Sequence, residues 1–194
     1  YYKAPDWIGP AAAEMLGIPY LVAEASHAPK RAGGPWDVGH RQVESALRQA
    51  VAVLTINPAD GACLPAGTRQ VALPPFLDTG RIDRVEPDRA GLAAAYGLDP
   101  GQPWLIAAAM MRSGDKLASY RELAAALGRL TERPWQLLLL GDGPARPQVE
   151  AGFAPLGARV RYAGVTETQS TATALKSADL FVWPAVNEAY GMAL

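Results

Sequence analysis

Residues 136–144 read QLLLLGDGP, and this stretch decides the fold of the chain. Four consecutive leucines place apolar side chains on both faces of a strand, which is typical of a parallel sheet that is covered on both sides. Two glycines and a proline follow at once. Glycine permits a tight turn, and proline is favoured at the first position of a helix. The stretch therefore predicts a buried parallel strand that turns directly into a helix.

The same alternation extends from this strand in both directions. In the second half of the chain, the pattern predicts strands at 104–109, 136–140, 159–162 and 180–183 and helices at 89–96, 117–130, 145–151 and 168–176. In the first half, it predicts strands at 20–23, 52–56 and 71–73 and helices at 6–16, 38–50 and 58–63. Such alternation indicates an α/β fold with parallel sheets. The proline-rich residues 74–88 are interpreted as an interdomain linker, with a long surface loop as the alternative.

Composition excludes several classes of protein. The chain has 194 residues, with 18 Lys and Arg against 19 Asp and Glu, so it lacks the basic excess expected of a nucleic-acid-binding protein. Its longest apolar run, WLIAAAMM at 104–111, is too short for a membrane-spanning helix. The single cysteine, Cys63, excludes an internal disulfide and a cysteine-ligated zinc site. The expected location is the cytoplasm.

Candidate binding residues follow the predicted strands, because ligands of open α/β sheets bind at the carboxyl ends of the strands. Arg112 and Lys116 follow the strand at 104–109 and could bind a diphosphate through charge-assisted hydrogen bonds. A solvated charged loop is the alternative interpretation. Gly141 follows the strand at 136–140 and lets the backbone approach a ligand, although a tight strand-to-helix turn explains the same glycine.

The next two strand ends carry further candidates. Gly164 exposes backbone that is suited to reading a base edge, and Thr166 is expected to cap the helix that follows it, with Gln169 completing a capping box. Glu188 follows the last strand and is placed to bind sugar hydroxyls. The N–H groups at Gly191 and Met192 could hold a phosphate at a helix start, although an acidic residue near a helix start is also favourable without a ligand.

Taken together, these turns resemble the group 1 (family 4) retaining glycosyltransferases, which have the GT-B fold of two Rossmann-like domains with parallel sheets flanked by helices. Six motifs carry the resemblance in chain order: LPPFLD at 73–78, the pair Arg112 and Lys116, LLLLGDGP at 137–144, YAGV at 162–165, ADLFVWP at 178–184 and EAYG at 188–191. The stretch PYLVAEASH at 19–27 also resembles the strand of the first domain that ends near a histidine.

The resemblance implies a role for each matching position. Arg112 and Lys116 would bind the donor diphosphate and stabilise it as a leaving group, and His27 would lie near the sugar or the acceptor. The residues that would bind the donor sugar are Glu188, Tyr190, Gly191 and Met192. Those that would meet the nucleotide are Gly141, Gly164 and Val165. The chain contains no Asp-x-Asp motif, which fits a reaction that uses cationic side chains and needs no metal or other cofactor.

The resemblance also implies the organisation of the chain. Residues 1–79 would be the C-terminal part of the acceptor-side domain, and residues 80–194 the N-terminal part of the nucleotide-sugar donor domain, so both domains would be incomplete. The second glutamate of the family's Glu-x7-Glu motif would fall two positions beyond Leu194. We therefore expect an internal fragment of a bacterial enzyme that is inactive alone.

The implied activity is transfer of a sugar from a nucleoside-diphosphate sugar to a glycan, lipid or small-molecule acceptor, with retention of configuration. The resemblance permits peripheral contact of the parent enzyme with a membrane. Two alternatives stay open. One is another GT-B enzyme, such as a sugar-nucleotide epimerase or a phosphorylase. The other is a non-catalytic α/β module that binds nucleotides.

Overall fold

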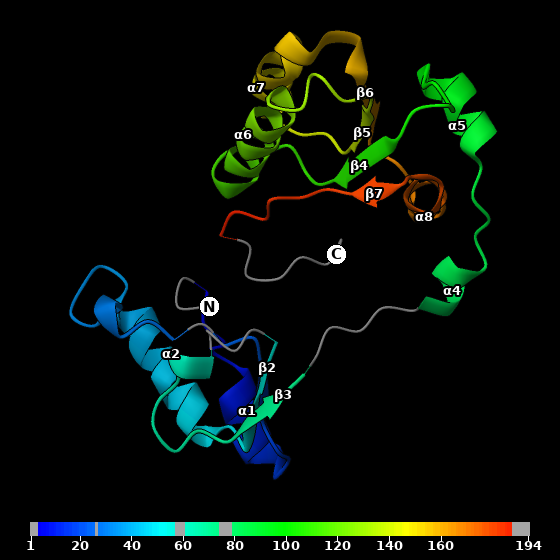
Figure 1. The fold of residues 1–194 in the computed structure, drawn as a ribbon. Coiled ribbons are helices and arrows are strands. Elements are labelled where there is room, and N and C mark those ends of the chain that lie inside the picture. The colour runs from blue at the N-terminus through cyan, green and yellow to red at the C-terminus, as the bar shows by residue number, and fades with distance from the viewer. Residues whose placement is uncertain (1–3, 26, 57–60, 74–78, 188–194) are drawn as a thin grey trace. The chain divides into compact units, whose positions relative to one another are not determined.

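A computed structural model describes residues 4–25, 27–56, 61–73 and 79–187 of the chain. The chain divides into two compact units, Tyr1–Phe76 and Leu77–Leu194, and each is an α/β unit built on a parallel sheet (Figure 1). The α/β fold class read from the sequence is confirmed. The predicted boundary after residue 79 and the acceptor-side and donor-side assignments stay predictions.

The second unit contains a four-stranded parallel sheet in the order β6-β5-β4-β7. Its strands are β4 (Trp104–Ala108), β5 (Gln136–Leu140), β6 (Val160–Gly164) and β7 (Leu180–Phe181). Strand β5 coincides with the predicted strand at 136–140, and all five of its residues are buried. It lies between β4 and β6, so both of its edges are hydrogen-bonded, and the run of leucines stands at the centre of the unit.

Helices cover both faces of this sheet, as the continuous apolar strand requires. The helices on one face are α6 (Asp115–Gly128) and α7 (Arg146–Phe153), and those on the other are α5 (Arg89–Tyr96) and α8 (Thr168–Ser177) (Figure 1). Side chains of β5 alternate between the two layers. Leu137 and Leu139 pack in the core beneath α6 and α7, whereas Leu138 and Leu140 pack towards α5 and α8. Full burial of a leucine is worth about 1.5–3 kcal/mol, so this strand anchors both layers.

Part of the predicted linker is helical in the structure. Within the predicted linker at 74–88, the structure forms a short helix, α4 (Thr79–Asp83), while residues 74–78 lie outside the described residues. The Nζ atom of Lys176 in α8 donates to the carbonyl of Asp83 at 2.9 Å. This tertiary contact satisfies a carbonyl at the end of α4, and sequence periodicity gives no sign of it.

The first unit contains a three-stranded parallel sheet in the order β1-β2-β3. Its strands are β1 (Leu21–Ala23), β2 (Ala52–Thr55) and β3 (Gln70–Ala72), and its helical segments are α1 (Gly9–Leu16), η1 (Pro29–Arg31) and α2 (Asp37–Gln49). Val43 and Leu47 of α2 pack against Val22 and Val53 of the sheet. Helix α1 begins three residues later than predicted, because the Asp6 carboxylate accepts the N–H groups of Ile8 and Gly9 in a turn before it.

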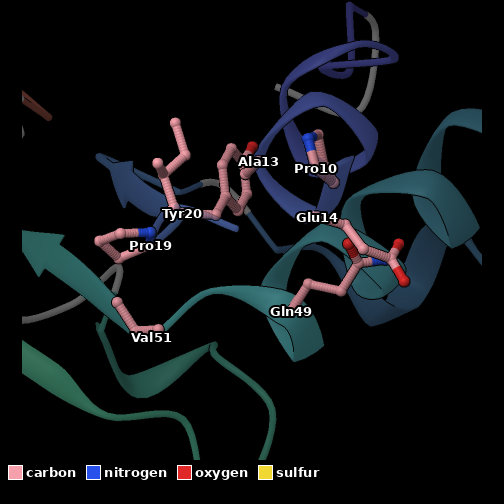
Figure 2. Close-up of a pocket in the computed structure, with 8 residues that line it drawn as sticks. Pro10, Ala13, Glu14, Pro19, Tyr20, Gln49 and Val51 are labelled. Atoms are coloured by element: carbon pink, nitrogen blue, oxygen red, sulfur yellow. The ribbon is translucent and has the colours of Figure 1, made fainter. Parts of the chain in front are cut away.

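A pocket of about 350 Å³ lies beside α1 in the first unit (Figure 2). It is lined by Pro10, Ala13, Glu14, Ile18, Pro19, Tyr20, Gln49 and Val51. Tyr20 and Val51 directly precede β1 and β2, so the pocket opens at the amino ends of these strands. Ligands of open α/β sheets bind at the carboxyl ends. The pocket is therefore at the opposite end of this sheet from His27, which follows β1.

None of the helices within the described residues is both long enough and apolar enough to cross a membrane.

Asp179 fastens the start of β7 to β4, and its removal should destabilise the second unit. Its carboxylate accepts the backbone N–H of Trp104 at 2.7 Å and Arg89 Nη1 at 3.1 Å, and these contacts lower its pKa. Trp104 is 2% exposed. Asp179→Ala leaves this buried N–H without an acceptor, so we expect a loss of about 1–3 kcal/mol in urea-induced unfolding.

Asp179→Asn is the matched control for that measurement. Asparagine keeps an oxygen that can accept the Trp104 N–H but loses the charge that pairs with Arg89. Its loss should be smaller than that of the alanine variant, because exposed ion pairs contribute at most about 1 kcal/mol. Equal losses for the two variants would show that the ion pair, rather than the backbone hydrogen bond, carries the stabilisation.

Candidate functional site

The strand order of the second unit defines where a ligand is expected. Strand β4 comes first in the chain within this sheet, β5 lies on one side of it, and β7 lies on the other. The order therefore reverses at β4, and the carboxyl ends of β4 and β7 flank the switch point. In open α/β sheets the crevice at such a point is the usual binding site. The segments that follow β4 and β7 are thus the candidate site.

The segment after β4 carries both predicted cationic residues. Arg112 is exposed and forms no ion pair with any residue that the structure describes. Gly114 has a φ of 79° and is the N-cap residue of α6, which makes Lys116 the second residue of that helix. The first N–H groups of a helix have no partner inside it and favour anions. The segment therefore places an exposed guanidinium next to a helix N-terminus.

The segment after β7 is fastened to the same helix. Ser119 Oγ accepts the backbone N–H of Val186 at 3.0 Å, and Asn187 Nδ2 donates to Asp115 Oδ1 at 3.2 Å. Lys116 Nζ lies 5.4 Å from the centroid of the Trp183 ring. These contacts join the chain after β7 to the first two turns of α6. Both sides of the switch point are therefore held by one element.

Two residues of this segment have left-handed backbone. Ala185 has a φ of 53° and Asn187 a φ of 48°. Asparagine tolerates this region, whereas for alanine it costs on the order of 1 kcal/mol or more and persists where the surroundings impose it. The bonds from Val186 and Asn187 to α6 supply that constraint. The predicted sugar-binding residues come directly afterwards, and they lie outside the described residues: Glu188, Tyr190, Gly191 and Met192.

The glycines after β5 are required by close backbone packing. A Cβ on Gly141 would lie 2.0 Å from the carbonyl oxygen of Ala109, and one on Gly143 would lie 2.3 Å from that of Met111. Their φ values are 124° and 151°. The Met111 N–H also donates to the Asp142 carbonyl at 2.8 Å, so the β4 and β5 loops stay paired beyond the strands. The fold accounts for Gly141, and its contact with a nucleotide stays a prediction.

A local ion-pair network stabilises the same turn. Asp142 accepts the Gly143 N–H and Arg146 Nη1, both at 2.7 Å, and these contacts lower the pKa of the Asp142 carboxyl. Arg146 also donates to Glu150 at 2.7 Å, and the guanidinium carbon lies 5.9 Å from the centroid of the Tyr162 ring. Arg146 therefore binds acidic residues in and after the turn that follows β5. Arg112 and Lys116 are the cationic residues at the switch point.

The end of β6 presents an open surface. Gly164 has a φ of 69°, and no described atom lies within 4 Å of where its Cβ would be. Its carbonyl accepts the Gly141 N–H at 2.7 Å, and Val165 is 81% exposed. The predicted cap is wrong, because Glu167 is the N-cap residue of α8 and Thr166 Oγ1 instead bonds to Thr171 Oγ1. Nucleotide contacts at Gly164 and Val165 stay predictions.

His27 lies in the first unit, after β1. Its Nδ1 is 2.6 Å from the carbonyl oxygen of Cys63, and its Nε2 is 3.3 Å from Glu44 Oε1. Its ring stacks on that of His40 with centroids 5.2 Å apart. The structure therefore shows a histidine with fixed orientation. Its predicted position near the sugar or the acceptor stays a prediction.

Sequence reasoning missed the residues that position the site. Ser119 and Asn187 hold the segment after β7, and the Trp183 ring packs edge-on against Tyr120 at 4.9 Å. Ser119 is fully buried on a face of α6 that is otherwise apolar. The sequence did offer one signal, because a serine at a helix position that should be apolar indicates a buried hydrogen bond. It could not identify the partner, Val186, which is 67 residues away.

The comparisons with known proteins agree with this geometry. The family model described as "Glycosyl transferases group 1" matches residues 102–194, which include the switch point. No curated protein matches the chain by sequence.

Solved structures match both units of the chain. Sucrose-phosphate synthase from Thermosynechococcus elongatus matches with a TM-score of 0.70 and 18% identity, covering 96% of this chain and 49% of its own. A glycosyltransferase from Rickettsia africae matches with a TM-score of 0.62, 13% identity and coverages of 90% and 53%. WaaG, a glycosyltransferase involved in lipopolysaccharide biosynthesis, matches with a TM-score of 0.59, 20% identity and coverages of 89% and 52%.

The chain thus spans about half the length of these solved glycosyltransferases. At these identities the matches show the fold, and the family match lies within the second unit, at residues 102–194. Together they support the resemblance that the motifs indicated: the chain has the fold of the GT-B glycosyltransferases, and its residues 102–194 match the model of the group 1 glycosyltransferases.

Proposed function

We propose that the second unit binds the diphosphate of a nucleoside-diphosphate sugar, and that the intact protein transfers the sugar to an acceptor with retention of configuration. One observation carries this proposal. The topological switch point of the sheet lies between two segments fastened to α6, and Arg112 and Lys116 stand at that place. The group 1 match over residues 102–194 supports the same class of reaction.

The chemistry assigned to the two cations is electrostatic. In the transfer, the bond between the anomeric carbon and the donor's terminal phosphate oxygen breaks, and the nucleoside diphosphate leaves with increased negative charge. The acceptor hydroxyl forms the new bond and loses its proton. Positive groups fixed where charge develops lower the barrier to such a step. Arg112 and Lys116 would serve this role without a metal ion, and α6 would add the N–H groups of its first turn.

The remaining family roles complete the proposal. Glu188, Tyr190, Gly191 and Met192 would bind the transferred sugar, and Gly164 and Val165 would contact the base through their backbone. His27 would act on the sugar or the acceptor from the first unit. The acceptor would be a glycan, lipid or small molecule. We propose that the reaction takes place in the cytoplasm, and that the 194-residue chain binds the donor but does not turn it over.

The experiment has a binding arm and a transfer arm. Isothermal calorimetry of the chain with UDP, GDP, ADP and their glucose conjugates should show binding of at least one nucleoside diphosphate in the presence of EDTA. Proton NMR of the product made by the intact protein should then show the donor's anomeric configuration. An inverted product would refute retention, and a strict need for added Mg²⁺ would refute the cationic mechanism.

The same two measurements distinguish the proposed glycosyltransferase from a non-catalytic module that only binds nucleotides. Such a module would bind a nucleoside diphosphate in the first arm, but the intact protein would form no glycosylated product in the second. An epimerase would instead convert the nucleotide sugar in the absence of any acceptor, which the same NMR spectra would reveal.

A further inference from the structure

We propose that the first unit contains a binding site for Zn²⁺ formed by His27, His40 and Glu44. One ligand atom from each of these residues lies within 4.8 Å of the other two. His27 comes from the loop after β1, whereas His40 and Glu44 stand one turn apart on α2, so the fold brings together residues from two elements. His27 also has a role in the proposed transfer, but Zn²⁺ binding is measured without donor or acceptor, so the two proposals can fail separately.

The separations match a tetrahedral metal site. His27 Nε2 and His40 Nε2 lie 3.3 and 3.6 Å from Glu44 Oε1. With zinc–nitrogen and zinc–oxygen distances of about 2.0–2.2 Å, adjacent ligands of a tetrahedron are about 3.3–3.6 Å apart. Two of the three separations therefore already have the required length. Three protein ligands of the His, His, Glu type leave the fourth position for water or another ligand.

The tautomer of His27 favours a cation at its other nitrogen. The Cys63 carbonyl accepts only, so Nδ1 carries the proton in the 2.6 Å hydrogen bond between them. In the neutral ring, Nε2 then directs a lone pair at the Glu44 carboxylate, which is stable only with a cation or a second proton between them. A carbonyl that holds Nδ1–H while Nε2 faces a metal is the usual orienting arrangement for a zinc-bound histidine.

His40 is the buried ligand of the proposed site. Its side chain is 3% exposed, and among the residues that the structure describes no group hydrogen-bonds to its Nδ1. Its Nε2 lies 3.6 Å from Glu44 Oε1, too far for a hydrogen bond. Buried polar groups without partners are costly. A metal bound at Nε2 would give that nitrogen a partner and would leave Nδ1 without one among the described residues.

The two rings stack with centroids 5.2 Å apart. Glu44 Oε2 lies 4.0 Å from Arg48 Nη1, so Oε1 is the oxygen that faces both histidines. The nitrogen and oxygen donors suit Zn²⁺ and similar transition metals, whereas Mg²⁺ and Ca²⁺ prefer all-oxygen ligands.

The test is metal binding by the purified chain after treatment with a chelator. Calorimetry with ZnCl₂ should give one site per chain, and Co²⁺ should give the visible absorption of a tetrahedral nitrogen and oxygen site. His27 and His40 are the only histidines in the sequence, so any imidazole-ligated site must use them. Glu44→Gln keeps the shape of a partly exposed side chain and should weaken Zn²⁺ binding by at least about 10–100-fold.

Two controls keep the result specific. Glu14→Gln makes the same change on an exposed residue of α1, and Cys63→Ser removes the chain's only thiol while keeping the backbone carbonyl that holds His27. Both should bind Zn²⁺ like the unmodified chain, and His27→Ala should lose the site. Absence of Zn²⁺ binding, equal affinity in Glu44→Gln, or loss of binding in Cys63→Ser would each overturn the proposal.

Discussion

Gly141→Ala is expected to destabilise the second unit by about 3 kcal/mol or more. The added Cβ would lie 2.0 Å from the Ala109 carbonyl oxygen, and the residue has a φ of 124° that side-chain-bearing residues rarely adopt. Overpacking costs about 1–3 kcal/mol, and strained backbone adds a similar amount. The Ala109 carbonyl cannot move freely, because the buried hydroxyl of Tyr120 donates to it at 2.7 Å.

The measurement is thermal unfolding followed by circular dichroism. For a unit of about 100 residues, a loss of 3 kcal/mol lowers the melting temperature by roughly 10–25 °C. Gly152→Ala is the control, because Gly152 lies in α7 with no described atom within 4 Å of its Cβ position. That change should be neutral or stabilise by up to about 1 kcal/mol. A melting temperature of Gly141→Ala within 2 °C of the unmodified chain would contradict the packing argument.

Arg112→Ala is expected to lower the rate of transfer strongly while leaving the fold intact. We expect a fall of about 10²–10³ in the rate of the intact protein, the usual effect of removing one donor that stabilises developing charge. Diphosphate affinity should fall by about 10–100-fold, since a hydrogen bond to a charged group contributes about 1.5–3 kcal/mol. The side chain is exposed and unpaired within the described residues, so stability should change by less than 0.5 kcal/mol, as is usual for surface substitutions.

Arg129→Ala is the matched control for this experiment. Arg129 is exposed at the opposite end of α6, so the variant has the same net charge but keeps the switch point. Calorimetry with the nucleoside diphosphate selected by the binding arm should distinguish the two variants. Equal loss of affinity in both would indicate non-specific attraction of the anion and would contradict a defined role for Arg112.

Much of the second unit could be predicted from residue patterns alone. The four leucines of β5 specify a strand buried on both faces, and the glycines that follow specify a turn with close backbone approach. Helix α5 has its predicted bounds because Asp88 accepts the Gly91 N–H at its start and Gly97 adopts a left-handed conformation at its end. These are local signals, and they depend on residues close together in the chain.

The errors arose where a side-chain contact outside the local pattern decides the conformation. Strand β7 ends at Phe181, two residues before its predicted end, and Trp183 packs on Tyr120 of α6. Thr166 did not cap α8, because its hydroxyl bonds to the side chain of Thr171. In each case the competing partner is a side chain whose position the local pattern does not specify.

The sequence by itself determined the α/β class, the order of the strands along the chain and the residues expected at the strand ends, but not the helical segments η1 and α4. Tertiary structure alone decided the strand order that places the switch point between β4 and β7, and the anchoring of the segment after β7 by Ser119 and Asn187. It also brought His27 to His40 and Glu44. The physical reason is that periodicity and turn chemistry act between near neighbours, whereas hydrogen bonds and ligand clusters form between residues that only the folded chain brings together.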